Sequence, residues 1–158
     1  MAQRPNIHDV LDRAPTALDT YKAIEKGFTG GSLSEVERTI VLLAASYENR
    51  CTYCVPVYTM KARSLGMDET TIEALRSGGP LPEERHDVLS RVTRSLVRNR
   101  GQLPAELRTR FTEVGFSEDQ LIEVVLGIAQ KTVTNYVNAL FEPELDEKLQ
   151  PARWEPPR

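Results

Sequence analysis

The feature that most constrains the fold is a succession of helix-like segments separated by residues that start or stop helices. Apolar residues recur at the period of one helix face, as in Leu18, Tyr21, Ile24 and Phe28. The alternation of apolar and polar residues that is typical of a half-buried strand is nearly absent from the chain. The sequence therefore predicts an all-α protein.

Two capping boxes mark the starts of the most apolar helices. They are Ser-Glu-Val-Glu at 34–37 and Ser-Glu-Asp-Gln at 117–120, where the first and last side chains can satisfy free backbone N–H groups. The first box opens a helix that is apolar around most of its circumference over 40–45, so we expect it to be buried. The second opens the longest predicted helix, 118–141, which Pro143 stops.

The chain is expected to form a single helical domain over residues 1–158, with 1–14 as an N-terminal helical arm and 149–158 as an extended C-terminal tail. The lone Trp154 in this tail suggests docking on a surface, such as that of a neighbouring subunit. A weak internal helical repeat is also visible. Each copy consists of a helix end, a glycine, an apolar residue, a capping residue and the start of the next helix. Any two consecutive helices can be joined in this way, so the pattern does not require a duplicated unit.

Charge and hydropathy exclude several classes of function. The net charge is −3 and hydrophobic residues make up 40% of the chain, so nothing global indicates binding to nucleic acid or to an anionic membrane. No run reaches the length of a transmembrane helix, and the N-terminus lacks the apolar core of a signal peptide. We expect a cytoplasmic protein, in which a cysteine pair is more often catalytic or metal-binding than a structural disulfide.

The chain has two cysteines, Cys51 and Cys54, in C-x-x-C spacing. Positions three apart in a continuous helix have Cβ atoms roughly 5–6 Å apart, whereas a disulfide requires about 3.8 Å. The pair can therefore close only if Cys51 lies at or before a helix start, and Pro56 is tolerated only in a first turn. The helix is predicted to start between the two cysteines, where free N–H groups favour a thiolate.

Two other interpretations of the cysteines remain open. Zinc requires four ligands, and the chain adds only His8 and His86 without paired spacing, so no metal and no cofactor are expected. Alternatively, both thiols are inert and buried, since free cysteine packs as a small hydrophobe. The residues before the first thiol are polar and Arg50 is next to it, which favours redox chemistry over inert burial.

The chain resembles the AhpD-like, or carboxymuconolactone decarboxylase, family over roughly residues 15–148. The resemblance implies an all-helical homo-oligomer, a trimer or hexamer, whose C-x-x-C members reduce hydroperoxides and are recycled by a thiol or dihydrolipoyl-type reductant. It also implies that Cys54 attacks the peroxide and that Cys51 resolves the sulfenic acid. The features that carry it are Leu33-Ser34-Glu35, Glu48-Asn49-Arg50-Cys51-Thr52-Tyr53-Cys54, Ala62, Leu65-Gly66-Met67 and Lys131-Thr132-Val133-Thr134-Asn135-Tyr136-Val137-Asn138.

The chain departs from this family at the residues that relay protons. The relay histidine is replaced by Tyr58 and the relay glutamate by Thr39, while Ala139 stands where a further histidine is expected. A tyrosine with a pKa of about 10 is a poor base at neutral pH, although it can donate a hydrogen bond. Activation would then depend on the helix N-terminus and Arg50, so only a modest fall in the thiol pKa is expected.

Two residues are candidates to replace the relay. Glu48 lies three residues before Cys51 and is either a proton-transfer group or a solvated helix-end carboxylate; Tyr58 lies one turn after Cys54 and is either a thiol contact or a core aromatic. The predicted function is a thiol-dependent peroxidase or disulfide reductase. The alternatives are a non-enzymatic helical oligomer and a decarboxylase-like enzyme.

Overall fold

The computed structural model describes residues 5–157, and the regular structure in that range is entirely helical, which confirms the predicted all-α class. No helix of the described range is long and apolar enough to cross a membrane. In chain order the elements are α1 (Asn6–Asp12), α2 (Pro15–Thr29), α3 (Glu35–Glu48), α4 (Cys54–Ser64), α5 (Glu69–Ser77), α6 (Glu84–Arg98), α7 (Ala105–Glu113), α8 (Glu118–Phe141) and the 3-10 helix η1 (Glu147–Ala152).

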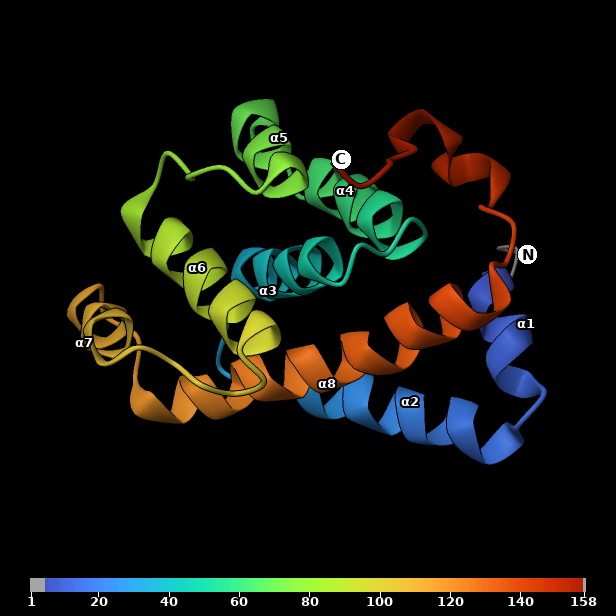
Figure 1. The fold of residues 1–158 in the computed structure, drawn as a ribbon, viewed down its shortest axis with the longest axis horizontal. Coiled ribbons are helices and arrows are strands. Elements are labelled where there is room, and N and C mark those ends of the chain that lie inside the picture. The colour runs from blue at the N-terminus through green and yellow to red at the C-terminus, as the bar shows by residue number, and fades with distance from the viewer. Residues whose placement is uncertain (1–4, 158) are drawn as a thin grey trace.

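Helix α3 lies at the centre of the fold, where α4, α5, α6 and α8 pack around it (Figure 1). Residues 40–45 are all buried, which confirms the prediction from their apolar circumference. Around them lies the main core cluster, which includes Phe28, Leu89 and Phe111 from surrounding helices. The cysteines follow directly after this central helix.

The predicted helix starts and stops are present. At Ser34 the side chain accepts from the Glu37 N–H at 3.2 Å and the Glu37 carboxylate accepts from the Ser34 N–H at 2.7 Å, and Ser117 heads an equivalent box. The two segments of the weak internal repeat, 61–69 and 110–118, share their stop geometry. Gly66 and Gly115 have φ angles of 74° and 91°, values that favour glycine.

Helix α8 packs closely against α2 and α3, and Gly127 permits this approach (Figure 1). A Cβ atom at Gly127 would lie 2.7 Å from Val41 Cγ1 and 2.8 Å from Phe28 Cζ. Both neighbours belong to the buried core and have little room to move. The absent side chain therefore sets the distance between α8 and its two neighbours.

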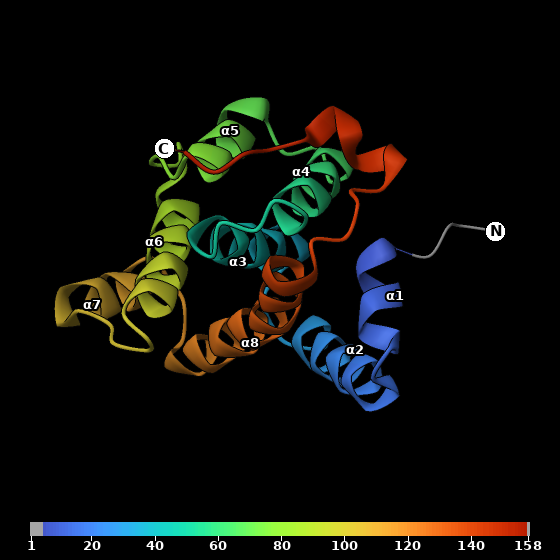
Figure 2. The same cartoon turned by 45° about the vertical axis from the view of Figure 1, so that its right-hand side comes forward.

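The C-terminal segment differs from the expected extended tail. Residues 147–152 form η1, which packs on α4, and the chain then continues toward α5 (Figure 2). Trp154 docks on its own chain rather than requiring a neighbour: its side chain is buried in the main core cluster and its indole N–H donates to the Arg76 carbonyl at 2.8 Å. Residues 1–4 of the predicted arm and Arg158 lie outside the described residues.

Candidate active site

A helix-ending turn brings Cys51 to its position. The Cys51 N–H donates to the Ser46 carbonyl at 2.9 Å and the Arg50 N–H to the Tyr47 carbonyl at 2.9 Å, the hydrogen-bond pattern of a Schellman motif. Arg50 occupies the left-handed position with φ of 56°, which a non-glycine residue adopts at some energetic cost. The turn places the first thiol beyond the end of α3.

The second cysteine is the first residue of α4, as predicted from the spacing, and Pro56 lies in the first turn. Both thiols are free and buried, with 2% of Cys51 and 3% of Cys54 exposed. The Cys54 N–H donates to Cys51 Sγ at 3.2 Å. Cys51 therefore precedes the helix and lies against Cys54, the arrangement that an intramolecular disulfide requires.

The surroundings distinguish the two thiols strongly. The hydrogen bond from Cys51, assisted by Lys131, Thr134 and Asn135 of α8, outweighs burial and lowers the pKa of Cys54 to about 6. Cys54 Sγ lies 3.6 Å from Thr134 Oγ1, whose hydroxyl can donate to the ionised sulfur. The pKa of Cys51 is raised by the same hydrogen bond with Cys54 and by burial. Cys54 is therefore the thiolate and Cys51 the thiol that donates to it.

Lys131 supplies the cation of this site. Its side chain is 1% exposed, and its Nζ donates to the Tyr58 hydroxyl at 2.7 Å while lying 4.4 Å from the centre of that ring. Burial favours a neutral Lys131, but attraction to Tyr58 and to the Cys54 thiolate outweighs burial and raises its pKa. Burial raises the pKa of Tyr58 despite Lys131, so the phenol keeps its proton.

Tyr58, predicted from its position one turn after Cys54, is thus joined to the thiol region through Lys131. The cation expected from the sequence was Arg50, but its guanidinium donates to the Pro157 carbonyl at 3.2 Å. The fall in the Cys54 pKa is also larger than the modest one expected, because the hydrogen bond from Cys51 stabilises the thiolate and the buried Lys131 ammonium adds to it.

Glu48 lies at the end of α3 in an ion-pair cluster with α6. Its carboxylate is 3.2 Å from Arg94 Nε and 2.8 Å from Arg98 Nε. Burial opposes ionisation of Glu48, but hydrogen bonds from Arg98 and Arg94 outweigh it and lower the pKa. Its proton-transfer role stays a prediction, and these partners suit a permanently ionised carboxylate.

Residues 131–138 of α8 carry part of the family resemblance, but none of their side chains was predicted to belong to the site. The contributors from α8 form a buried polar stripe at helical spacing within an otherwise apolar helix. That pattern could have indicated a site, because buried polar groups require partners. The stripe consists of Lys131, Thr134, Asn135 and Asn138.

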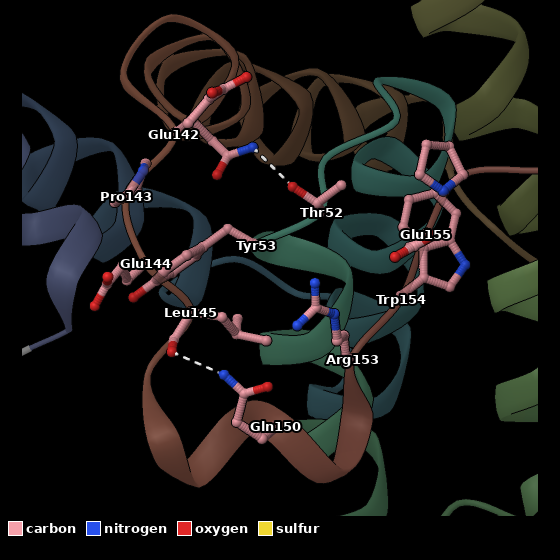
Figure 3. Close-up of a pocket in the computed structure, with 12 residues that line it drawn as sticks. Thr52, Tyr53, Glu142, Pro143, Glu144, Leu145, Gln150, Arg153, Trp154 and Glu155 are labelled. Carbon is pink, nitrogen blue, oxygen red and sulfur yellow. Dashed lines mark hydrogen bonds between the residues drawn. The ribbon is translucent and has the colours of Figure 1, made fainter.

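A cavity of about 750 Å³ opens beside the C-x-x-C turn. Figure 3 shows Thr52 and Tyr53 facing the C-terminal segment, whose Arg153 and Trp154 form the other wall. The Tyr53 hydroxyl donates to Asp146 and accepts from the Ile7 N–H at 3.3 Å. Tyr53 therefore holds the turn between the cysteines against residues near both ends of the chain, whereas Thr52 is exposed and lines the cavity.

A second cavity of about 320 Å³ lies among α2, α3, α4 and α8. Tyr58 and Thr39 both line it, so the two positions where the family places relay residues share one cavity. Thr39 Oγ1 donates to the Glu35 carbonyl at 2.8 Å, within its own helix. The relay positions are together in space although their side chains differ from the family pattern.

The fold and site define an all-helical protein with two cysteines at a helix start. The pKa values of these thiols are shifted in opposite directions, and Lys131 of α8 helps to stabilise the Cys54 thiolate. Residues 13–80, which include both cysteines, match the model of the carboxymuconolactone decarboxylase family. This partial match and the all-helical, AhpD-like fold agree with the resemblance found in the sequence.

Individual relatives agree with this resemblance. The chain is 25% identical over 142 residues to YdfG of Bacillus subtilis (strain 168), covering 87% of this chain and 93% of YdfG. A peroxidase-related AhpD core protein of Ralstonia eutropha JMP134 superposes with a TM-score of 0.82 at 16% identity, over 92% of this chain and 78% of that one. The debrominase Bmp8 superposes at 0.79 with 15% identity, over 93% and 80%.

Proposed function

We propose that the protein is a thiol-dependent peroxidase that reduces hydroperoxides with the Cys51/Cys54 pair. The observation that carries the proposal is buried Lys131, which bonds Tyr58 at 2.7 Å and helps to hold Cys54 as a thiolate. Because the thiolate is the reactive form, a pKa of about 6 leaves Cys54 largely ionised at neutral pH. The AhpD-like fold and its peroxidase-related relatives support the same chemistry.

In the first step, the Cys54 thiolate attacks the terminal oxygen of the hydroperoxide. An S–O bond forms, the O–O bond breaks and an alkoxide leaves, so Cys54 becomes a sulfenic acid while the peroxide is reduced to an alcohol. The departing alkoxide needs a proton. Tyr58, whose oxygen accepts from the Lys131 ammonium, is placed to supply it as a polarised phenol, with Lys131 stabilising the charge.

In the second step, the Cys51 sulfur attacks the Cys54 sulfenic acid. An S–S bond forms and the hydroxyl leaves as water, taking up the proton of the Cys51 thiol. A dithiol reductant, of the thiol or dihydrolipoyl type, then reduces the disulfide and is itself oxidised to a disulfide. This division of roles follows from the opposite pKa shifts of the two thiols.

A purely structural role for the thiols accounts poorly for Lys131. Two inert cysteines would pack in apolar surroundings, whereas burying an ammonium beside them costs free energy unless its charge is used or compensated. Its ring contacts among the described residues are with Tyr58 and Tyr21, neither of which carries a carboxylate. The Cys54 thiolate is the anion that compensates this charge.

The direct test is peroxide consumption with a dithiol donor. We expect Cys54→Ser to lose all turnover, because it removes the attacking atom. Cys51→Ser should react once and stop, with a sulfenic acid on Cys54 that dimedone traps and mass spectrometry locates. Non-reduced peptide maps of the oxidised wild type should show a Cys51–Cys54 disulfide.

The control is Ser46→Ala in α3, which leaves both thiols in place. Turnover that survives Cys54→Ser, or dimedone adducts on Cys51 in place of Cys54, would contradict the assignment of roles. A wild type that consumes no hydroperoxide and forms no intramolecular disulfide would contradict the proposal as a whole.

A further inference from the structure

Asn135 of α8 is buried beside the thiols with an incomplete set of hydrogen bonds. It is 2% exposed, and its Oδ1 accepts from Asn49 Nδ2 at 2.9 Å. Its own Nδ2 is buried and has no hydrogen-bond partner among the described residues. Buried amide N–H groups are normally paired, so this donor requires an acceptor.

The contacts of the polar stripe place Asn135 against Cys54. The preceding residue, Thr134, has its Oγ1 3.6 Å from Cys54 Sγ, and Asn138 Nδ2 donates to Thr52 Oγ1 at 3.4 Å. Asn135 is also among the groups whose hydrogen bonds lower the pKa of Cys54. A thiol sulfur accepts hydrogen bonds weakly, whereas a thiolate accepts them strongly. Ionisation of Cys54 therefore supplies the acceptor that Asn135 Nδ2 lacks.

Asn49 decides which end of the Asn135 amide faces the sulfur. A side-chain amide carries an acceptor and a donor on opposite sides of one carbon atom, and only its partners distinguish the two orientations. Because Asn49 donates to Oδ1, the nitrogen of Asn135 is left to face the thiol. The reverse orientation would bring two NH₂ groups together and present Oδ1 to the sulfur, where an acceptor would oppose the thiolate.

Asn49 is itself fixed by the turn that leads to Cys51. It is the C-cap residue of α3, and its N–H donates to the Ala45 carbonyl at 3.0 Å. The chain then passes through the left-handed Arg50 and reaches Cys51. This one turn therefore positions the first thiol and also holds the amide that faces the second.

We propose that Asn49 orients the Asn135 amide so that Asn135 Nδ2 donates a hydrogen bond to the sulfur of the Cys54 thiolate. Asn135 is then a catalytic residue, because it touches the reacting sulfur, and Asn49 is a positioning residue that acts through it. The inference rests on the proposed peroxidase function, which uses the thiolate, and adds these two residues to it.

The test titrates Cys54 in the full chain by ultraviolet absorbance of the thiolate, without peroxide. The other titratable groups that interact with Cys54 are Cys51, Tyr53, Tyr58 and Lys131, and each of them has a raised pKa. Asparagine does not titrate. The absorbance change near pH 6 therefore reports Cys54.

Asn135→Leu removes the donor with little change in size. It should raise the midpoint of thiolate formation by about one to two pH units, as the loss of one hydrogen bond to a charged group predicts. Asn49→Asp tests the orientation directly. A carboxylate only accepts hydrogen bonds, so it should bind Asn135 Nδ2, turn the amide over and present Oδ1 to the sulfur. The midpoint should then rise at least as far as in Asn135→Leu.

The new carboxylate also brings a negative charge, and a double variant separates its effect from that of the amide. When Asn49→Asp is added to Asn135→Leu, only the charge remains, so the rise should be clearly smaller than the one that Asn49→Asp causes in the wild type. The matched control is Asn99→Asp, the same change at the exposed C-cap residue of α6. It should leave the midpoint unchanged.

Asn49→Ala frees the amide without adding a charge, and its half-buried position suits a small replacement. It should raise the midpoint as well. If the bond between Asn49 and Asn135 only ties α3 to α8, this variant lowers the free energy of unfolding in urea and leaves the midpoint unchanged, and that result would overturn the proposal. Equal rises from Asn49→Asp with and without Asn135→Leu would overturn it too, because the charge alone would explain them.

Because the titration needs no turnover, the two proposals fail separately. Midpoints that depend on Asn49 and Asn135 in a protein without peroxidase activity would sustain this inference and refute the proposed function. Peroxide consumption in a protein whose midpoint ignores both asparagines would sustain the proposed function and refute this inference.

Discussion

At the scale of single residues, Tyr58 stands where the family has a relay histidine, and it accepts a hydrogen bond from Lys131. A histidine can accept and release a proton near neutral pH. Lys131 and Tyr58 have raised pKa values, so both are already protonated at neutral pH and neither can accept a proton from a thiol. The pair can therefore stabilise a thiolate and polarise a donor, but it cannot serve as a base. The thiolate has to be formed before the substrate arrives, which agrees with a Cys54 pKa of about 6.

We predict that Lys131→Met raises the pKa of Cys54. Removing the ammonium leaves the hydrogen bond from Cys51 as the main group opposing burial, so the midpoint of thiolate formation should rise above about 6. Ultraviolet absorbance of the thiolate against pH measures this midpoint.

In the wild type, peroxide consumption should be constant from neutral to mildly alkaline pH. It should fall as the pH drops through about 6, because the Cys54 thiolate is then protonated.

The matched control is Lys148→Met, which removes an exposed lysine of η1. It should leave the midpoint unchanged. If Lys131→Met also leaves it unchanged, the thiolate is held by Cys51, Thr134 and Asn135 without the ammonium, and the assigned role of Lys131 is wrong.

Helix α8 determines the site at the element scale, because it supplies the polar stripe and is held at close range to α2 and α3. Its register against α4 decides which α8 side chains reach Cys54. Gly127 lies one turn before Lys131 and permits contact with Phe28 and Val41. A change in this packing should therefore affect both stability and the thiol.

We predict that Gly127→Ala destabilises the protein by about 1–3 kcal/mol despite the better helix propensity of alanine, because its Cβ would meet buried core atoms at 2.7–2.8 Å. The free energy of unfolding in urea measures this. Gly27→Ala in α2 is the matched control, since its Cβ meets nothing within 4 Å. It should stabilise the protein by up to about 1 kcal/mol. Equal effects at both positions would show that α8 can shift freely.

At the scale of the whole molecule, the outer face of α8 is left uncovered by this chain. The exposed large hydrophobic side chains of the described residues all lie on this helix, with Leu140 75% and Ile122 65% exposed. An apolar strip of this kind is typical of an interface. Their full set is Ile122, Val125, Leu126, Tyr136, Leu140 and Phe141.

We predict a homo-oligomer, a trimer or hexamer, in which copies of this chain cover the α8 face. Ile122→Glu with Leu140→Glu should give a smaller folded species in light scattering, because desolvating two carboxylates opposes association. Thr70→Glu, at an exposed position of α5, is the control and should keep the native mass. A wild type that is monomeric at micromolar concentration would refute the prediction.

The sequence by itself determined the features that depend on neighbouring residues. Both capping boxes, the burial of 40–45 and the start of α4 at Cys54 were predictable, because caps, helical period and proline geometry act within a few positions. The family resemblance added the roles of the two thiols and the relay positions. These local rules are enough to give the fold class and half of the site.

Only the tertiary structure decided which distant side chains complete the site. Lys131 and Tyr58 are 73 positions apart, and no local rule pairs them. The same holds for Trp154, which fills the core of its own chain, and for Thr39 and Gln130, which share a cavity. Their contacts arise from how the helices pack, because the register of α8 on its neighbours depends on many side chains at once. The contact between Lys131 and Tyr58 therefore appears only in the folded molecule.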